Sequence, residues 1–133
     1  MTQSDTQANK GYPNILVVED SSADAALVKM QVLSVWPNAK VTVVDSLAKS
    51  FVAYDESKPN LLLLDLNLPD GFGPRSVEEI MSFSRGVPVL VITGMESMLT
   101  MNEAIRYGAS GVVFKDKIMT DEFKETLLKS IKG

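Results

Sequence analysis

Carboxylate, hydroxyl and ammonium side chains stand directly after four apolar segments of this 133-residue sequence. In chain order they are Glu19-Asp20, Asp65, Thr93 and Lys115. Clustered carboxylates repel one another unless a cation compensates them, and a set of oxygen ligands favours a hard cation such as Mg²⁺. A carboxylate beside Mg²⁺, with a hydroxyl and an ammonium ready for the oxygens of a phosphoryl group, suits aspartyl-phosphate chemistry. These residues therefore predict phosphoryl transfer, provided that the fold brings them together.

The segment Leu61–Leu64 indicates how such a residue is positioned. Four consecutive leucines without polar alternation are typical of a parallel strand that is covered on both faces. Ligands of open α/β sheets bind just outside the carboxyl ends of the strands, and Asp65 stands at that end. Asp65 is therefore the first candidate site residue. The alternative is that Asp65 only caps the loop that turns at Pro69-Asp70-Gly71.

Alternating strand and helix patterns predict the fold. Apolar runs, most of them β-branched, predict five strands, at 14–18, 40–44, 61–65, 87–92 and 111–114. Helical patterns follow after Ser21, after Ser46, over 74–84, over 96–107 and after Thr120. Connections of this length favour a parallel sheet covered by helices. We expect a single α/β, flavodoxin-like, doubly wound domain with five helices and the strand order 2-1-3-4-5, which brings the ends of strands 1, 3, 4 and 5 to one edge.

Two local patterns carry further predictions. The segment Ser21-Ser22-Ala23-Asp24 resembles a capping box, in which the carboxylate of Asp24, three residues after Ser21, caps the first turn of the helix. Met95, Met98 and Met101 recur at helical spacing. These methionines either pack into the core or form an adaptable surface for a partner, because thioethers repack easily.

Composition excludes several function classes. The sequence has no cysteine and no histidine, so it offers no disulfide, thiolate nucleophile, Ser-His-Asp triad or histidine-ligated zinc. Its net charge is −4 without a block of Lys and Arg, which argues against nucleic-acid binding. No apolar run approaches the roughly 18 residues of a membrane span, and residues 1–10 lack the pattern of a secretion signal. We expect a cytoplasmic chain with a polar tail over 1–12 and one domain over 13–133.

The order and spacing of the motifs are more specific than any single motif. They are the acidic pair Glu19-Asp20, Leu-Leu-Leu-Asp ending at Asp65, Pro-Asp-Gly-Phe-Gly from Pro69, Ile-Thr-Gly around Thr93, and Phe-Lys ending at Lys115. Together they resemble the receiver domain of bacterial two-component response regulators, from about Asn14 to the end of the chain.

This resemblance implies a role for each site residue. It implies that Asp65 is the phosphoacceptor, and that Asp20, Asp65 and the backbone carbonyl of Asn67 hold Mg²⁺, with Glu19 supporting the ion through water. By the same resemblance Thr93 is the switch hydroxyl that follows the phosphoryl group, and Lys115 pairs with that group. Gly94, a small residue, would leave room for the phosphoryl group and its donor.

The resemblance also implies partners. The phosphoryl donor would be a sensor histidine kinase or a histidine phosphotransfer protein, which agrees with the absence of histidine here. Catalysis would be limited to the domain's own phosphorylation and slower hydrolysis, so the chain is not expected to be an enzyme for external substrates. The output would be a protein bound at the helix around 96–107, the strand 111–114 and the last helix, or a relayed phosphoryl group. Neither a nucleic acid nor a membrane is expected as a partner.

Two positions depart from the family pattern. The aromatic residue often found three positions before the lysine is Val112 here, while Phe114 directly precedes Lys115. The aromatic part of the switch is therefore altered or shared with Tyr107. Lys115-Asp116 replaces the common Lys-Pro, and a non-proline cis bond would cost roughly 2.5–4 kcal/mol, so the loop is expected to differ there.

Other functions stay open at this point. One is a degenerate pseudo-receiver that binds a protein constitutively, and another is a receiver excised from a hybrid kinase. A phosphohydrolase with an aspartyl-phosphate intermediate generally needs a second aspartate two residues after the nucleophile, where this sequence has Asn67. Flavin or nucleotide binding is disfavoured because no glycine-rich or Ser/Thr-rich phosphate loop follows the first strand.

Overall fold

The computed structural model describes residues 12–84, 86–94 and 97–131. Its strands are β1 (Asn14–Val18), β2 (Lys40–Val44), β3 (Leu61–Leu64), β4 (Val89–Thr93) and β5 (Gly111–Phe114). Its helices are α2 (Ser22–Val35), α3 (Leu47–Ser57), α4 (Ser76–Met81), α5 (Met98–Arg106) and α6 (Asp121–Ser130), with a 3₁₀ turn, η1, over Lys115–Lys117. The strands form one parallel sheet in the order β2-β1-β3-β4-β5, which confirms the predicted doubly wound fold.

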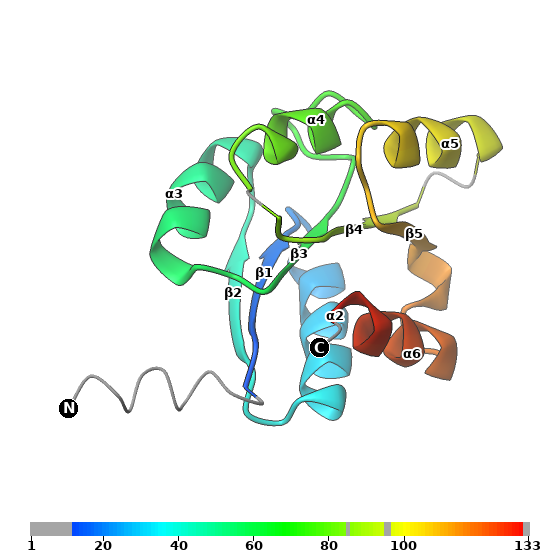
Figure 1. Cartoon of the computed structure of the whole chain (residues 1–133). Helices are drawn as coiled ribbons and strands as arrows, with labels where there is room; N and C mark the ends of the chain where they lie inside the picture. Colours follow the sequence, from blue (N-terminus) through cyan, green and yellow to red (C-terminus); the bar gives the residue numbers. More distant parts are fainter. Residues whose placement is uncertain (1–11, 85, 95–96, 132–133) are drawn as a thin grey trace.

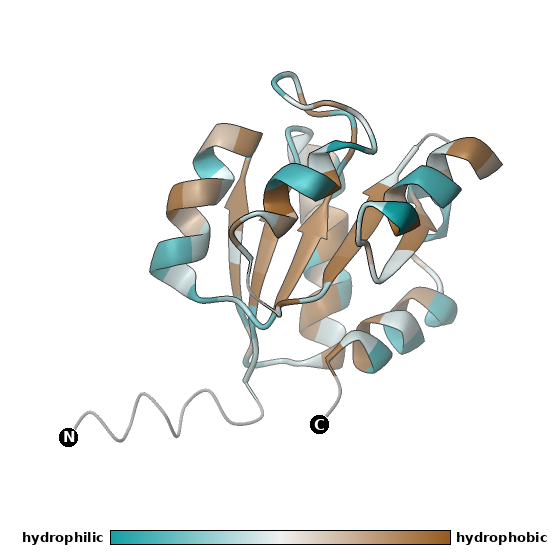
Figure 2. Ribbon diagram, turned by 45° about the horizontal axis from the view of Figure 1, so that its top comes forward, coloured by the Kyte–Doolittle hydropathy of each residue, from teal (hydrophilic) through white to brown (hydrophobic). Residues whose placement is uncertain are grey.

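Helices cover both faces of this sheet (Figure 1). On one face the alternate strand residues Leu16, Val18, Leu62 and Leu64 pack in one apolar cluster with residues of α3, α4 and α5. On the other face Ile15, Val17, Leu61 and Leu63 pack with residues of α2 and α6. The strands are therefore apolar on both faces, as their hydropathy in Figure 2 shows.

Hydroxyl side chains precede four of the five α-helices in the described part of the chain. Ser21, Ser46, Ser97 and Thr120 each accept a hydrogen bond from the backbone N–H three residues later. The predicted capping box at Ser21 is only half formed, because the Ser21 N–H donates to Glu19 Oε2 at 3.1 Å rather than to Asp24. The Asp24 carboxylate therefore points elsewhere, and this prediction was wrong for its reciprocal half.

Several element boundaries differ from the predicted ones, and strand β3 ends at Leu64 rather than at 65. Helix α4 spans Ser76–Met81 rather than 74–84, because the chain still turns at Gly73, where φ is +62°, and because Ser76 Oγ accepts from the Phe72 N–H at 2.8 Å. Helix α5 spans Met98–Arg106 rather than 96–107, and residue 96 lies outside the described residues. Strand β4 begins at Val89 rather than 87, because Pro88 has no N–H for the ladder.

The methionines of α5 do not fill the core. Met98 is 69% exposed and Met101 is half-buried, while Thr100 and Ala104 provide the buried side of the helix. The prediction of core packing is therefore wrong for Met98, and Met95 lies outside the described residues.

Among the described helices, none is both long and apolar enough to cross a membrane.

Candidate functional site

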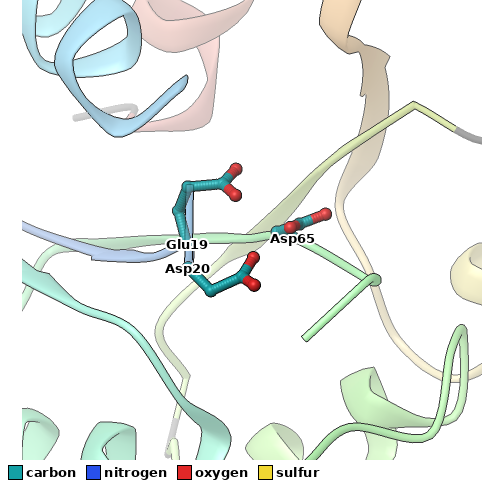
Figure 3. Close-up of side chains that lie close together, drawn as sticks. All are labelled: Glu19, Asp20 and Asp65. Carbon is teal, nitrogen blue, oxygen red and sulfur yellow. The ribbon is translucent and has the colours of Figure 1, made fainter. Parts of the chain in front are cut away.

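Three carboxylates meet where β1 and β3 end. Glu19 and Asp20 follow β1, and Asp65 follows β3 (Figure 3). The strand ladder aligns them, because Val18 pairs with Leu64 and the Asp65 N–H donates to the Val18 carbonyl at 3.0 Å. One carboxylate oxygen of each residue lies within 4.8 Å of the others. Glu19 and Asp65 are buried while Asp20 is exposed, so the cluster opens to solvent on the Asp20 side.

Lys115 supplies the positive charge of this cluster. Its Nζ lies 3.1 Å from Glu19 Oε1 and 3.4 Å from Asp65 Oδ2. The shortest ion pair, however, joins Lys115 Nζ to Asp24 Oδ2 at 2.8 Å. Asp24 is not among the predicted site residues, because its sequence position indicates only a helix cap. The available signal was an acid in the first turn after the acidic pair, on the helix that follows β1.

Burial and neighbouring groups shift the pKa values of Glu19 and Lys115. Burial and the hydrogen-bonded Asp65 carboxyl raise the pKa of Glu19 to about 7, despite its ion pair with Lys115. Burial lowers the pKa of Lys115, but the hydrogen bond to Asp24 and the charges of Asp65 and Glu19 raise it by more, so its pKa lies above the usual range. The site therefore holds a cation, Lys115, beside a carboxyl group, Glu19, whose burial favours proton uptake.

The remaining predicted residues lie at the same edge. Thr93 is buried at the end of β4 and pairs in register with Phe114, the residue before Lys115. The Asn67 backbone N–H donates to Asp65 Oδ1 at 3.1 Å. A Cβ placed on Gly94 would meet no heavy atom within 4 Å in the described chain, which agrees with an open space beside Thr93. The roles of these residues, and of the Asn67 carbonyl, stay predictions.

Two hydrogen bonds join the loop after Asp65 to α3, the helix between β2 and β3. Asp70 Oδ1 accepts from the Leu47 N–H at 2.8 Å, and Asp70 Oδ2 accepts from the Ala48 N–H at 3.0 Å. These two bonds lower the pKa of Asp70. Asp70 thus adds a second cap to α3, whose own cap is Ser46, and anchors the turn that follows the candidate phosphoacceptor.

The buried side-chain amide of Gln31 binds the segment after Lys115. Gln31 of α2 donates from Nε2 to the Ile118 carbonyl at 2.9 Å and to the Thr120 carbonyl at 3.4 Å.

The described peptide bonds contain no cis isomer, so the chain leaves Lys115 through a trans bond and the η1 turn. Val112 and Tyr107 are both partly buried against the apolar cluster shared by α3, α4 and α5, and the part that Tyr107 takes in switching stays a prediction.

Comparison with known proteins assigns this arrangement to a family. The family model of the response regulator receiver domain matches residues 15–127, a range that contains Glu19, Asp65 and Lys115. The chain belongs to this family. Receiver domains are the signalling modules of two-component systems and receive a phosphoryl group from kinases. They typically bind a divalent metal, and the oxygens of Glu19, Asp20 and Asp65 form an acidic cluster that suits one.

Individual relatives agree with this assignment. The transcriptional regulatory protein KdpE of Staphylococcus aureus is 30% identical over 101 residues, which are 76% of this chain and 42% of KdpE. The signal receiver domain of the DNA-binding response regulator MerR from Colwellia psychrerythraea superposes with a TM-score of 0.78 at 20% identity, over 86% of this chain and 94% of that one. The Mn²⁺-bound response regulator Rcp1 gives a TM-score of 0.70 at 26% identity, over 85% and 88%. The chain spans less than half the length of the curated relatives that it matches.

Proposed function

We propose that this receiver domain accepts a phosphoryl group on Asp65 and thereby switches a protein-binding surface or relays the group. The observation that supports it best is the placement of Lys115 Nζ 3.4 Å from Asp65 Oδ2, next to two further carboxylates at the strand ends. This arrangement offers a nucleophile, a cation for the phosphoryl oxygens and ligands for a divalent metal in one place.

The transfer itself follows from these groups. A carboxylate oxygen of Asp65 attacks the phosphorus atom of a phosphohistidine, the P–N bond breaks, and the imidazole nitrogen keeps the electron pair. The proposed donor is a histidine of a sensor kinase or a phosphotransfer protein, which agrees with the absence of histidine from the 133 residues. Lys115 pairs with an oxygen of the transferred group. Later attack by water on phosphorus releases inorganic phosphate and restores Asp65, so the domain is a switch rather than an enzyme for external substrates.

Mg²⁺ is the proposed metal. The carboxylates of Asp20 and Asp65 and the carbonyl of Asn67 would hold it, with Glu19 supporting through water. The acidic cluster suits this ion because its ligand atoms are carboxylate oxygens that lie close together. Bound Mg²⁺ would neutralise the developing charge on the phosphoryl oxygens. The Mn²⁺-bound state of Rcp1 supports a divalent ion on this fold.

The output surface is proposed at α5, β5 and α6, which lie together at one side of the molecule (Figure 1). Thr93 ends the neighbouring β4, and α5 is the next helix along the chain, so movement of the Thr93 hydroxyl toward a phosphoryl group would favour a change at α5. Met98 and Leu99 at that start are 69% and 68% exposed, which suits an apolar partner surface. The expected partner is a protein rather than a nucleic acid.

Phosphorylation by a small donor tests the proposal. The protein is incubated with Mg²⁺ and acetyl phosphate, and intact mass and amide NMR spectra are recorded. We expect the mass of one added phosphoryl group and shifts that spread from Thr93 to α5 and β5. Asp65→Asn should abolish the adduct, whereas the matched exposed change Asp45→Asn should keep it. A folded wild-type protein that forms no Mg²⁺-dependent adduct would refute phosphorylation and favour a constitutive binding module.

A further inference from the structure

The resting position of Lys115 depends on a residue outside the acidic cluster. An ammonium has three N–H donors, and here they reach Asp24, Glu19 and Asp65. The distance to Asp24 Oδ2 is 2.8 Å, and the distance to Asp65 Oδ2 is 3.4 Å. Asp24 lies on α2, whereas Glu19 and Asp65 lie at the strand ends. The shortest contact of Lys115 is therefore made to a helix rather than to the candidate phosphoacceptor.

Local structure leaves the Asp24 carboxylate available for this contact. The Ser21 N–H, which a reciprocal cap would bind, donates to Glu19 instead. The backbone N–H of Asp24 still donates to Ser21 Oγ at 3.2 Å, so the helix start does not require the Asp24 side chain. The carboxylate is also partly sheltered, with 31% of its side chain exposed, which strengthens an ion pair relative to a fully hydrated one.

A second contact fixes α2 against the segment that carries Lys115. Gln31 lies about two helical turns after Asp24, hence on the same side of α2. Its buried amide binds the carbonyls of Ile118 and Thr120 just beyond Lys115. These two contacts hold α2 against the segment that follows Lys115, so the Asp24–Lys115 ion pair joins two segments that are already packed together.

We propose that Asp24 is a positioning residue, which retains Lys115 in the unphosphorylated state and competes with the phosphoryl group for its ammonium. The proposal rests on the proposed phosphorylation of Asp65. A phosphoryl oxygen would require one of the three N–H donors of Lys115, all of which have partners at rest. Asp24 attracts the ammonium toward α2 and so opposes its movement to the phosphoryl group. Removing this charge shifts the equilibrium toward the phosphorylated arrangement.

Titration with beryllofluoride, a phosphoryl mimic, in the presence of Mg²⁺ tests the competition. Amide NMR gives the apparent dissociation constant for wild type, Asp24→Asn, Lys115→Met and the double variant. We expect Asp24→Asn to bind about three- to tenfold more tightly than wild type, as loss of a partly exposed ion pair suggests. Asp24→Glu should return the constant toward the wild-type value. In the Lys115→Met background, Asp24→Asn should have no further effect, which a merely structural role could not produce.

Asp45→Asn is the matched control, because it removes one charge at the same edge of the sheet from a carboxylate that pairs with Lys49 at 3.0 Å instead of Lys115. Its constant should stay within about twofold of wild type. A double-mutant cycle in urea without metal gives a second measurement, and Asp24 should couple to Lys115 while Asp45 should not. Equal or weaker beryllofluoride binding by Asp24→Asn, or no coupling, overturns the competition. Failure of wild type to bind beryllofluoride overturns both this inference and the proposed phosphorylation.

Discussion

Replacing Lys115 with methionine should destabilise the metal-free protein markedly. Methionine keeps an unbranched side chain of similar length, so the change removes mainly the ammonium. That ammonium contacts Glu19, Asp24 and Asp65 at 2.8–3.4 Å. Without it, these carboxylates and the neighbouring Asp20 would face one another with no cation among their described contacts.

The expected magnitude follows from burial. The side chains of Glu19 and Asp65 are 3% and 1% exposed, and that of Lys115 is 21% exposed. Removing one partner of a buried ion pair costs about 3–5 kcal/mol, whereas an exposed pair contributes at most about 1 kcal/mol. Because Lys115 keeps some hydration, we expect the free energy of unfolding to fall by about 3 kcal/mol. With an ordinary urea dependence, the midpoint of unfolding should fall by more than about 1 M.

Urea unfolding at neutral pH, followed by far-UV circular dichroism in the presence of EDTA, measures this loss. Lys49→Met is the matched control, because Lys49 pairs with Asp45 at 3.0 Å while both side chains are more than half exposed. The control should lose less than about 1 kcal/mol. Adding Mg²⁺ should narrow the gap between Lys115→Met and wild type, since another cation then compensates the carboxylates. If Lys115→Met lost no more stability than Lys49→Met, the reasoning from burial would be refuted.

Two further predictions concern the anchors of the site loops. Because the pKa of Asp70 is lowered from 3.8 in the folded state, its contribution to stability is present above that value and is lost as the pH falls through the folded-state pKa. Asp70→Ala should therefore cost about 0.5–1 kcal/mol at pH 7 in urea unfolding and progressively less in acid; a constant difference would contradict this. Gln31→Leu should lower the free energy of unfolding by about 1–3 kcal/mol, because the Ile118 carbonyl loses a buried donor. If the free energy of unfolding in urea did not change, the hydrogen bond from Gln31 would not stabilise this segment.

The fold was predictable because its signals are local and repeated. An unbroken apolar run such as Leu61–Leu64 specifies a strand buried on both faces, and helix-length connections then require parallel neighbours. Parallel strands end at the same edge, so the proximity of Glu19, Asp65 and Lys115 followed from topology without any knowledge of side-chain contacts. Hydroxyl caps such as Ser46 are equally local, and they mark helix starts within a residue or two.

Exposure of the apolar side chains of α5 was less predictable. Helical spacing shows that Met98 and Met101 lie near one another on the helix, but not which side of the helix meets the sheet. The packing of the whole helix determines which side faces the sheet, and it buries Thr100 and Ala104 and leaves Met98 exposed. The sequence pattern therefore left open a core and a surface interpretation, and only packing distinguished them.

What the sequence alone determined is the order of the elements and the set of chemical groups at the strand ends, because both depend on patterns a few residues long. Only the tertiary structure decided that Asp24 binds Lys115, that Gln31 binds the carbonyl of Ile118, and that Asp70 caps α3. These contacts join residues 91, 87 and 23 positions apart. Their partners depend on how far each side chain reaches once two elements have packed, a distance that no local pattern encodes.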